Sequence, residues 1–226
     1  MISLPLLNEF FIGALILFTV LMMEKPRLHG LVRYFTLASL SLAGMMATIA
    51  AIRGAEHLYL AAAATFLIKG VLLPWLLLRT AVRVHASMGI KFYVPASMTY
   101  FLIALLLVGA FWVAQNSPFG HIGEVGESIF LFEKSPLFAC IALILLGLAT
   151  MIIRRDLFSQ AVGFLTMENG ISAFGVVAAG GLPLLIEVGI ITTVVVGILL
   201  MTKLTSHMQE LYATTDTDLL TELTEE

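Results

Sequence analysis

The chain has 226 residues, of which 60% are hydrophobic and only 12% are charged, and its mean hydropathy is +1.02. Soluble domains carry roughly 25% charged residues, so this composition excludes an ordinary water-soluble domain and indicates an integral membrane protein. The formal net charge of −3 comes without a basic stripe, and no nucleic-acid partner is predicted.

Seven apolar segments are each long enough to cross a bilayer, which takes about 20 residues in a helix. In chain order they are 6–23, 30–52, 58–78, 95–115, 136–153, 159–179 and 182–203. Lipid cannot satisfy backbone N–H and C=O groups, so each segment should be helical, and all are too long and too evenly apolar for barrel strands. The predicted fold class is an all-α integral membrane protein with about seven transmembrane helices.

The connections between these segments alternate in charge. The second contains Arg53 offset by Glu56, the fourth is mainly acidic and the sixth is uncharged. The odd-numbered connections are basic and contain Lys25, Arg27, Arg79, Arg83, Lys91, Arg154 and Arg155. Because cytoplasmic loops are enriched in Lys and Arg, the N-terminus is predicted to lie outside and the C-terminus in the cytoplasm.

Residues 206–226 form an acidic tail in which Leu219, Leu220 and Leu223 share one possible helical face. Two interpretations are open. The tail is either a solvated amphipathic segment or a docking segment for a partner subunit.

Three ionisable side chains fall within the predicted spans: Lys69 in the third, Glu168 in the sixth and Glu187 in the seventh. A charge at the centre of a membrane helix costs roughly 2.5–3.5 kcal/mol on insertion scales, and such residues persist when they face protein or water. These three residues are therefore the candidates for a proton relay.

Glu168 lies nine residues into its span, which is about 14 Å at about 1.5 Å per residue and hence near mid-bilayer. Burial favours the neutral form of a carboxyl group and a nearby cation favours the charged form, so their competition lets such a group load and release protons. The alternative is a protonated, structural carboxyl group that holds helices together. Ala161, Ser172 and Gly175 share the face of Glu168, and small residues there would let another helix approach closely.

Lys69 is followed by Pro74 in the third span. A proline has no N–H to donate to the carbonyl of Gly70, so a helix kink is predicted at Pro74. A buried ammonium group beside the freed carbonyl could bind water and pass a proton. In the alternative interpretation, Lys69 simply pairs with a carboxylate of another subunit.

Glu187 lies about two turns from the outer end of its span, so an interfacial role is as open as a relay role. No metal site is predicted because the five histidines do not cluster at ligand spacing. They are His29, His57, His85, His121 and His207.

Residues 152–200 resemble the hydrogenase-4 component E family. The motifs that carry the resemblance are "MENG" at 167–170 and "EVGI" at 187–190, and "FLIKGVLLP" at 66–74 also fits. The last three predicted spans are similar to the NuoK (chain 4L) subunit of respiratory complex I and to the C subunit of multisubunit cation/proton antiporters.

The resemblance implies a non-catalytic subunit in the cell inner (cytoplasmic) membrane, next to antiporter-like subunits of an energy-converting oxidoreductase. It also implies three regions: four transmembrane helices in 1–133, a NuoK-like three-helix unit in 134–205 and the tail in 206–226. In complex I the sixth-span glutamate sits where this chain has Leu165, about one turn from Glu168. The related proteins have an acidic residue where this chain has Thr193, about two turns from Glu187.

The sequence thus predicts a membrane-arm subunit that contributes protonatable groups to ion translocation coupled to redox chemistry on other subunits. No cofactor is expected on this chain, since it lacks thiolate or histidine clusters for redox centres. No catalytic constellation is found either. Two alternatives stay open: a stand-alone seven-helix transporter or receptor, and a purely structural anchor subunit. A single carboxyl group beside apolar neighbours favours protons over sodium ions, since sodium prefers several oxygen ligands.

Overall fold

The computed structural model describes residues 4–83, 95–117, 134–179 and Lys203. Within these ranges every secondary-structure element is a helix, which confirms the all-helical prediction for the described part of the chain. The elements are α1 (Leu4–Met23), α2 (Leu28–Arg53), α3 (Glu56–Leu67), the π-helix η1 (Ile68–Leu72), α4 (Leu73–Arg83), α5 (Ala96–Asn116), α6 (Lys134–Ile153) and α7 (Leu157–Ala179).

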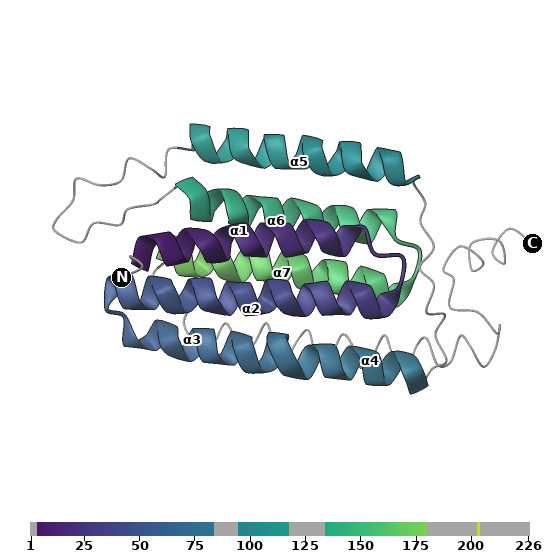
Figure 1. Cartoon of the computed structure of the whole chain (residues 1–226), viewed down its shortest axis with the longest axis horizontal. Coiled ribbons are helices and arrows are strands. Elements are labelled where there is room, and N and C mark those ends of the chain that lie inside the picture. Colours follow the sequence, from purple (N-terminus) through teal and green to yellow (C-terminus); the bar gives the residue numbers. More distant parts are fainter. Residues whose placement is uncertain (1–3, 84–94, 118–133, 180–202, 204–226) are drawn as a thin grey trace, which may run out of the picture.

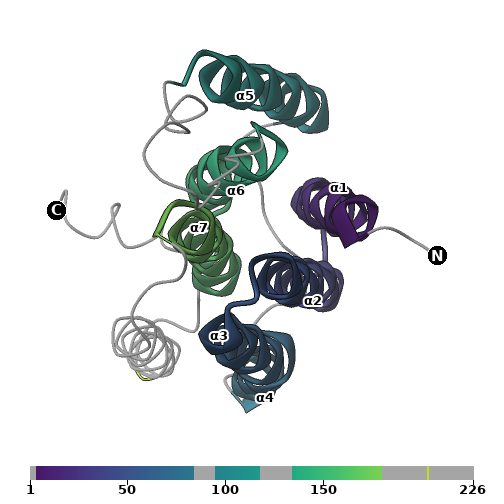
Figure 2. The same ribbon diagram turned by 90° about the vertical axis from the view of Figure 1, so that its left-hand side faces the viewer.

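The helices lie alongside one another with roughly parallel long axes (Figure 1). Helix α1 packs on α2 and α6 packs on α7, and the two pairs meet through contacts between α1 and α6 and between α2 and α7. The end-on view shows α3 and α4 flanking α2 at one edge and α5 flanking α6 at the other (Figure 2). Helix α7, the carrier of Glu168, therefore packs against both α2 and α6.

Five of the described helical stretches are long and apolar enough to cross a membrane: Leu4–Met23, Leu28–Arg53, Glu56–Val82, Ser97–Asn116 and Lys134–Ile153. They correspond to the first five predicted spans within a few residues at each end. The chain is thus a multi-pass membrane protein. The predicted sixth span, 159–179, is the 23-residue helix α7, which is not one of these five. The predicted seventh span and Glu187 lie outside the described residues.

Two helix ends show why the chain turns where it does. Gly54 follows α2 with a φ of 64°, and its N–H donates to the carbonyl of Ala50; glycine takes this left-handed conformation without steric cost. At the opposite end of the bundle, the Ser159 N–H donates to Asp156 Oδ1 at 2.8 Å. Asp156 therefore caps the start of α7.

Buried apolar side chains form two clusters, one toward each end of the bundle. The first cluster includes Met22, Leu28, Phe35, Leu73, Leu77, Leu146, Val162 and Leu165. The second cluster includes Ile12, Leu15, Leu42, Met45, Leu58, Leu143, Ala173 and Val176. In α7 the first cluster ends at Leu165 and the second begins at Ala173, so Glu168 lies between them.

Candidate functional site

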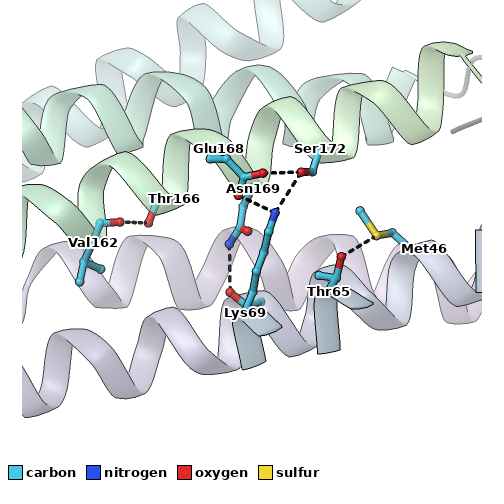
Figure 3. A network of polar contacts seen from close by, with 9 residues as sticks. Met46, Thr65, Lys69, Val162, Thr166, Glu168, Asn169 and Ser172 are labelled. Atoms are coloured by element: carbon cyan, nitrogen blue, oxygen red, sulfur yellow. Dashed lines mark hydrogen bonds and ion pairs between the residues drawn. The ribbon is translucent and has the colours of Figure 1, made fainter. Parts of the chain in front are cut away.

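A layer of buried polar side chains separates the two apolar clusters. It is built from three elements: α2 contributes Ser39, η1 contributes Lys69, and α7 contributes Glu168, Asn169 and Ser172. Figure 3 shows Lys69, Glu168, Asn169 and Ser172 meeting between the helices. The layer lies between the two apolar clusters, so its polar groups are shielded from solvent by protein atoms and a missing hydrogen bond there is costly.

Lys69 and Glu168 form an ion pair at the centre of this layer. The Lys69 Nζ atom lies 2.5 Å from Glu168 Oε2. Lys69 is 1% exposed and Glu168 is 4% exposed, so both charges are removed from solvent by protein atoms. The two candidates that the sequence identified separately, 99 positions apart, are thus brought together within one chain. Within this chain the ion-pair partner of Lys69 is Glu168, whereas pairing of Lys69 with a carboxylate of another subunit stays an untested alternative.

Ser172 connects the two members of the pair. Its hydroxyl group accepts a hydrogen bond from Lys69 Nζ at 2.9 Å and donates one to Glu168 Oε1 at 2.8 Å. Glu168 and Ser172 are one helical turn apart on α7, so they project from the same face. Each carboxylate oxygen therefore has a different neighbour, with the ammonium group at Oε2 and the hydroxyl group at Oε1.

Lys69 is carried by a local departure from α-helical geometry. Residues Ile68–Leu72 form a π-helix that ends two residues before Pro74, and the Leu73 N–H donates to the carbonyl of Ile68. Short π segments inside α-helices are uncommon and frequently occur at functional sites. The disturbance predicted from Pro74 thus takes the form of a π turn that includes Lys69 itself. A bend of the helix axis at Pro74 stays a prediction.

Asn169, the residue after Glu168, extends the layer to α2. Its Nδ2 group donates to Ser39 Oγ at 3.0 Å, and both residues are fully buried. The sequence placed an asparagine beside the glutamate but gave no reason to assign it a contact.

Helix α6 packs closely against α7, the helix that carries Glu168. A Cβ atom on Gly147 would collide with the backbone nitrogen of Met167, and one on Gly170 would lie 2.8 Å from the carbonyl oxygen of Cys140. Gly163 is similarly tight against Gly147. The glycines that allow the close approach of α6 and α7 are therefore Gly147, Gly163 and Gly170, a set distinct from the small residues that share the face of Glu168.

Two arginines at the ends of the bundle contact backbone carbonyl groups. Arg154, between α6 and α7, donates to the carbonyls of Met23 at 2.6 Å and Lys25 at 2.9 Å. Arg53, at the end of α2, donates to the carbonyls of Val176 at 2.9 Å and Val177 at 3.1 Å in the last turn of α7. The last carbonyls of a helix lack intrahelical partners and carry negative partial charge, so cations stabilise them.

The sequence counted both arginines only as loop charges, whereas in the structure both donate hydrogen bonds to backbone carbonyl groups. Arg154 is only 1% exposed. Burial lowers the pKa of its guanidinium group to about 10, and the charge of Asp156 opposes that shift. Arg154 therefore remains charged at neutral pH and fastens the connection between α6 and α7 to the end of α1.

The described residues contain no group of three or more His, Cys, Asp or Glu side chains that could hold a metal ion. The side chains of the polar layer are suited to acid–base chemistry. The layer has one carboxylate, one ammonium group and a hydroxyl group in mutual contact, so a proton can move between oxygen and nitrogen atoms without large side-chain displacement.

Comparison with known proteins supports the resemblance to hydrogenase-4 component E. The chain is 26% identical over 190 residues to hydrogenase-4 component E of Escherichia coli K12, covering 84% of each chain, and the Shigella flexneri protein of that name gives the same values. It is also 29% identical over 220 residues to a Mycobacterium tuberculosis protein named uncharacterized protein Rv0085, covering 96% of each chain. No family model and no solved structure matches.

Proposed function

We propose that this chain is a membrane-arm subunit of a hydrogenase- or complex I-like oxidoreductase, in which Lys69 and Glu168 exchange protons during ion translocation. The single observation that carries the proposal is the buried ion pair between them. Similarity to hydrogenase-4 component E over most of the chain supports membership of a multisubunit membrane complex.

The energetics of the pair favour a role in proton exchange. A buried ion pair adds little net stability, because desolvation of both charges offsets their attraction. Transfer of the proton from Lys69 to Glu168 leaves the net charge of the pair at zero. The free-energy difference between the charged and the neutral form of the pair is therefore smaller than the cost of burying either charge alone. A proton that arrives from a neighbouring subunit then changes the net charge of the layer from zero to +1.

The partners in this proposal are other membrane subunits, in particular antiporter-like subunits, within the lipid bilayer. A NuoK-like arrangement of the region 134–205 is part of the proposal, as is a second acidic group near the end of the chain. Glu187 takes that role if it substitutes for the residue missing at Thr193. Co-purification in mild detergent discriminates the alternatives, because a stand-alone transporter or receptor would be isolated without large partners.

The decisive experiment is Glu168→Gln, measured in membrane vesicles that contain the assembled complex. Glutamine keeps the shape and hydrogen bonding of glutamate but cannot titrate. We expect electron transfer with soluble donors to continue while proton translocation per electron falls severalfold, and Glu168→Asp to retain part of it. The matched control is Glu56→Gln, the same substitution at an exposed carboxylate at the start of α3. A normal proton-to-electron ratio in Glu168→Gln would make Glu168 a structural hydrogen-bonding residue.

The proposed orientation places the connection between α1 and α2 in the cytoplasm and the connection between α2 and α3 outside. His29 and His57 are exposed residues near these two connections, and the native Cys140 is buried. In a Cys140→Ser background, a membrane-impermeant maleimide should label His57→Cys, but not His29→Cys, in intact cells. The reverse pattern would invert the proposed topology.

A further inference from the structure

The amide oxygen of Asn169 is a buried acceptor in the polar layer that receives no hydrogen bond from the described residues. The side chain is 0% exposed and its Nδ2 group is bonded to Ser39, but no donor among the described residues reaches its Oδ1 atom. A buried acceptor left without a donor loses the hydrogen bond that it would make to water in the unfolded chain. Almost all such groups in native proteins bond to protein or to ordered water.

Three contacts between the helices place Asn169 near the ion pair of Lys69 and Glu168. Asn169 bonds to Ser39, Glu168 pairs with Lys69, and a Cβ atom on Gly70 would lie 2.8 Å from the Leu40 side chain. The segments Ser39–Leu40, Lys69–Gly70 and Glu168–Asn169 thus meet at one level of the bundle. Figure 3 shows Asn169 and Lys69 in this same layer.

Lys69 has an N–H donor that no described acceptor uses, and it complements the free acceptor of Asn169. Its ammonium group has three N–H donors. One is donated to Ser172 Oγ, and the group forms an ion pair with Glu168 Oε2, although that oxygen accepts no hydrogen bond from the described residues. Within the described part of the chain no third acceptor is found. An unused donor and an unused acceptor therefore lie in one closed layer.

We propose that one internal water molecule occupies this layer, accepting a hydrogen bond from Lys69 Nζ and donating one to Asn169 Oδ1. A buried water molecule needs two to four polar partners, and these two atoms supply the minimum. A sodium ion is disfavoured at the same place because it would face the Lys69 ammonium group. The water molecule links the ion pair to Asn169 and so to Ser39 on α2. Its use in proton movement rests on the proposed function, whereas its presence does not.

The direct test is a high-resolution structure of the purified full-length chain with the subunits that accompany it. We expect a density peak within about 3.2 Å of both Lys69 Nζ and Asn169 Oδ1. An Asn169 Oδ1 atom bonded only to protein, or an empty layer at a resolution that shows other internal waters, would overturn the proposal.

A second test uses thermal unfolding of Asn169→Leu and Ser39→Ala in detergent. Both variants lose the Asn169–Ser39 hydrogen bond, but only Asn169→Leu removes the amide oxygen. If water is bound, Asn169→Leu strips it of a partner and should lower Tm by at least about 3 °C more than Ser39→Ala. If no water is bound to the oxygen, its removal abolishes the cost of burying an acceptor without a hydrogen bond. An Asn169→Leu variant that is as stable as Ser39→Ala, or more stable, would therefore contradict the proposal. Neither readout depends on proton translocation, which Glu168→Gln tests separately.

Discussion

At mid-depth of the bundle, the Lys69 ammonium group is held by a carboxylate, whereas at the two ends the guanidinium groups of Arg53 and Arg154 are held by backbone carbonyl oxygens. A carbonyl group cannot be protonated at physiological pH, so the charge state of each arginine contact is fixed. A carboxylate can accept a proton, so the charge state of the central contact can change. Charge at the ends therefore holds helices in place, and charge at the centre can respond to its surroundings.

The largest effect that would test this difference is expected for Lys69→Met. It leaves Glu168 buried opposite an apolar side chain, and breaking one member of a buried ion pair costs about 3–5 kcal/mol of the free energy of unfolding. The double variant Lys69→Met/Glu168→Gln removes both charges and should recover most of that loss. Unfolding of the detergent-solubilised chain measures both values.

Rescue by a second substitution is the signature of the central contact. If the double variant is as unstable as Lys69→Met alone, the two side chains do not act as a pair, and the contrast between centre and ends disappears.

A somewhat smaller loss is expected for Arg154→Gln at the end of the bundle. Removing the guanidinium group leaves the carbonyls of Met23 and Lys25 without this charged donor, and hydrogen bonds to charged groups contribute roughly 1.5–3 kcal/mol. Arg154→Lys should fall between wild type and Arg154→Gln, because lysine keeps the charge but not the fork of donors. A second substitution at Met23 or Lys25 should not rescue the loss, since the acceptors at these two residues are backbone atoms. Proton translocation per electron should be normal in the assembled fraction.

The pH dependence of the Arg154 contact gives a further check. A folded-state pKa of about 10 lies below the ordinary value of 12.5, so the unfolded state binds more protons only between these two values. The stability that this group contributes thus rises with pH in that window and is constant below it. The difference in Tm between wild type and Arg154→Gln should therefore be unchanged from about pH 6 to about pH 9. A slope in that range would show that the charge state of the Arg154 contact changes between about pH 6 and about pH 9.

The smallest of the three effects is expected for Gly147→Ala, which separates the helix that carries Glu168 from its neighbour. The added methyl group would press on the backbone of Met167, and overpacking of this kind costs about 1–3 kcal/mol. Gly109→Ala on α5 is the matched control, because nothing lies within 4 Å of its added Cβ. Equal stability of the two variants, measured by thermal unfolding, would show that α7 can shift without disturbing the layer.

The sequence predicted the helical elements well because each apolar run is a local signal. The described helices agree with the first six predicted segments to within a few residues at most ends, and the exception is the third, which runs on to Arg83 through α4. Lys69 and Glu168 were also identifiable, since a charge in an apolar run is conspicuous by its cost. These predictions needed only the composition of one segment at a time.

The contacts between segments were not predictable in the same way. The Lys69–Glu168 pair joins residues from separate helices, and nothing in either segment encodes the position of the other. Arg53 and Arg154 were read as loop charges because their carbonyl partners carry no side-chain signal. Gly147, Gly163 and Gly170 resemble other glycines of apolar helices until the facing backbone is known.

The π turn at Ile68–Leu72 also sets the rotational phase of the long helical stretch that contains it. Thr65, Lys69, Leu73, Leu77 and Ala81 are all buried and are spaced four residues apart. In a regular α-helix, each such step overshoots a full rotation by about 40°, so the last residue would be about 160° from the first. The wider π turn takes up part of this excess. The turn thus acts as a phase correction: it accommodates one additional residue, so that Leu73, Leu77 and Ala81 stay on the buried side of the helix that carries Lys69.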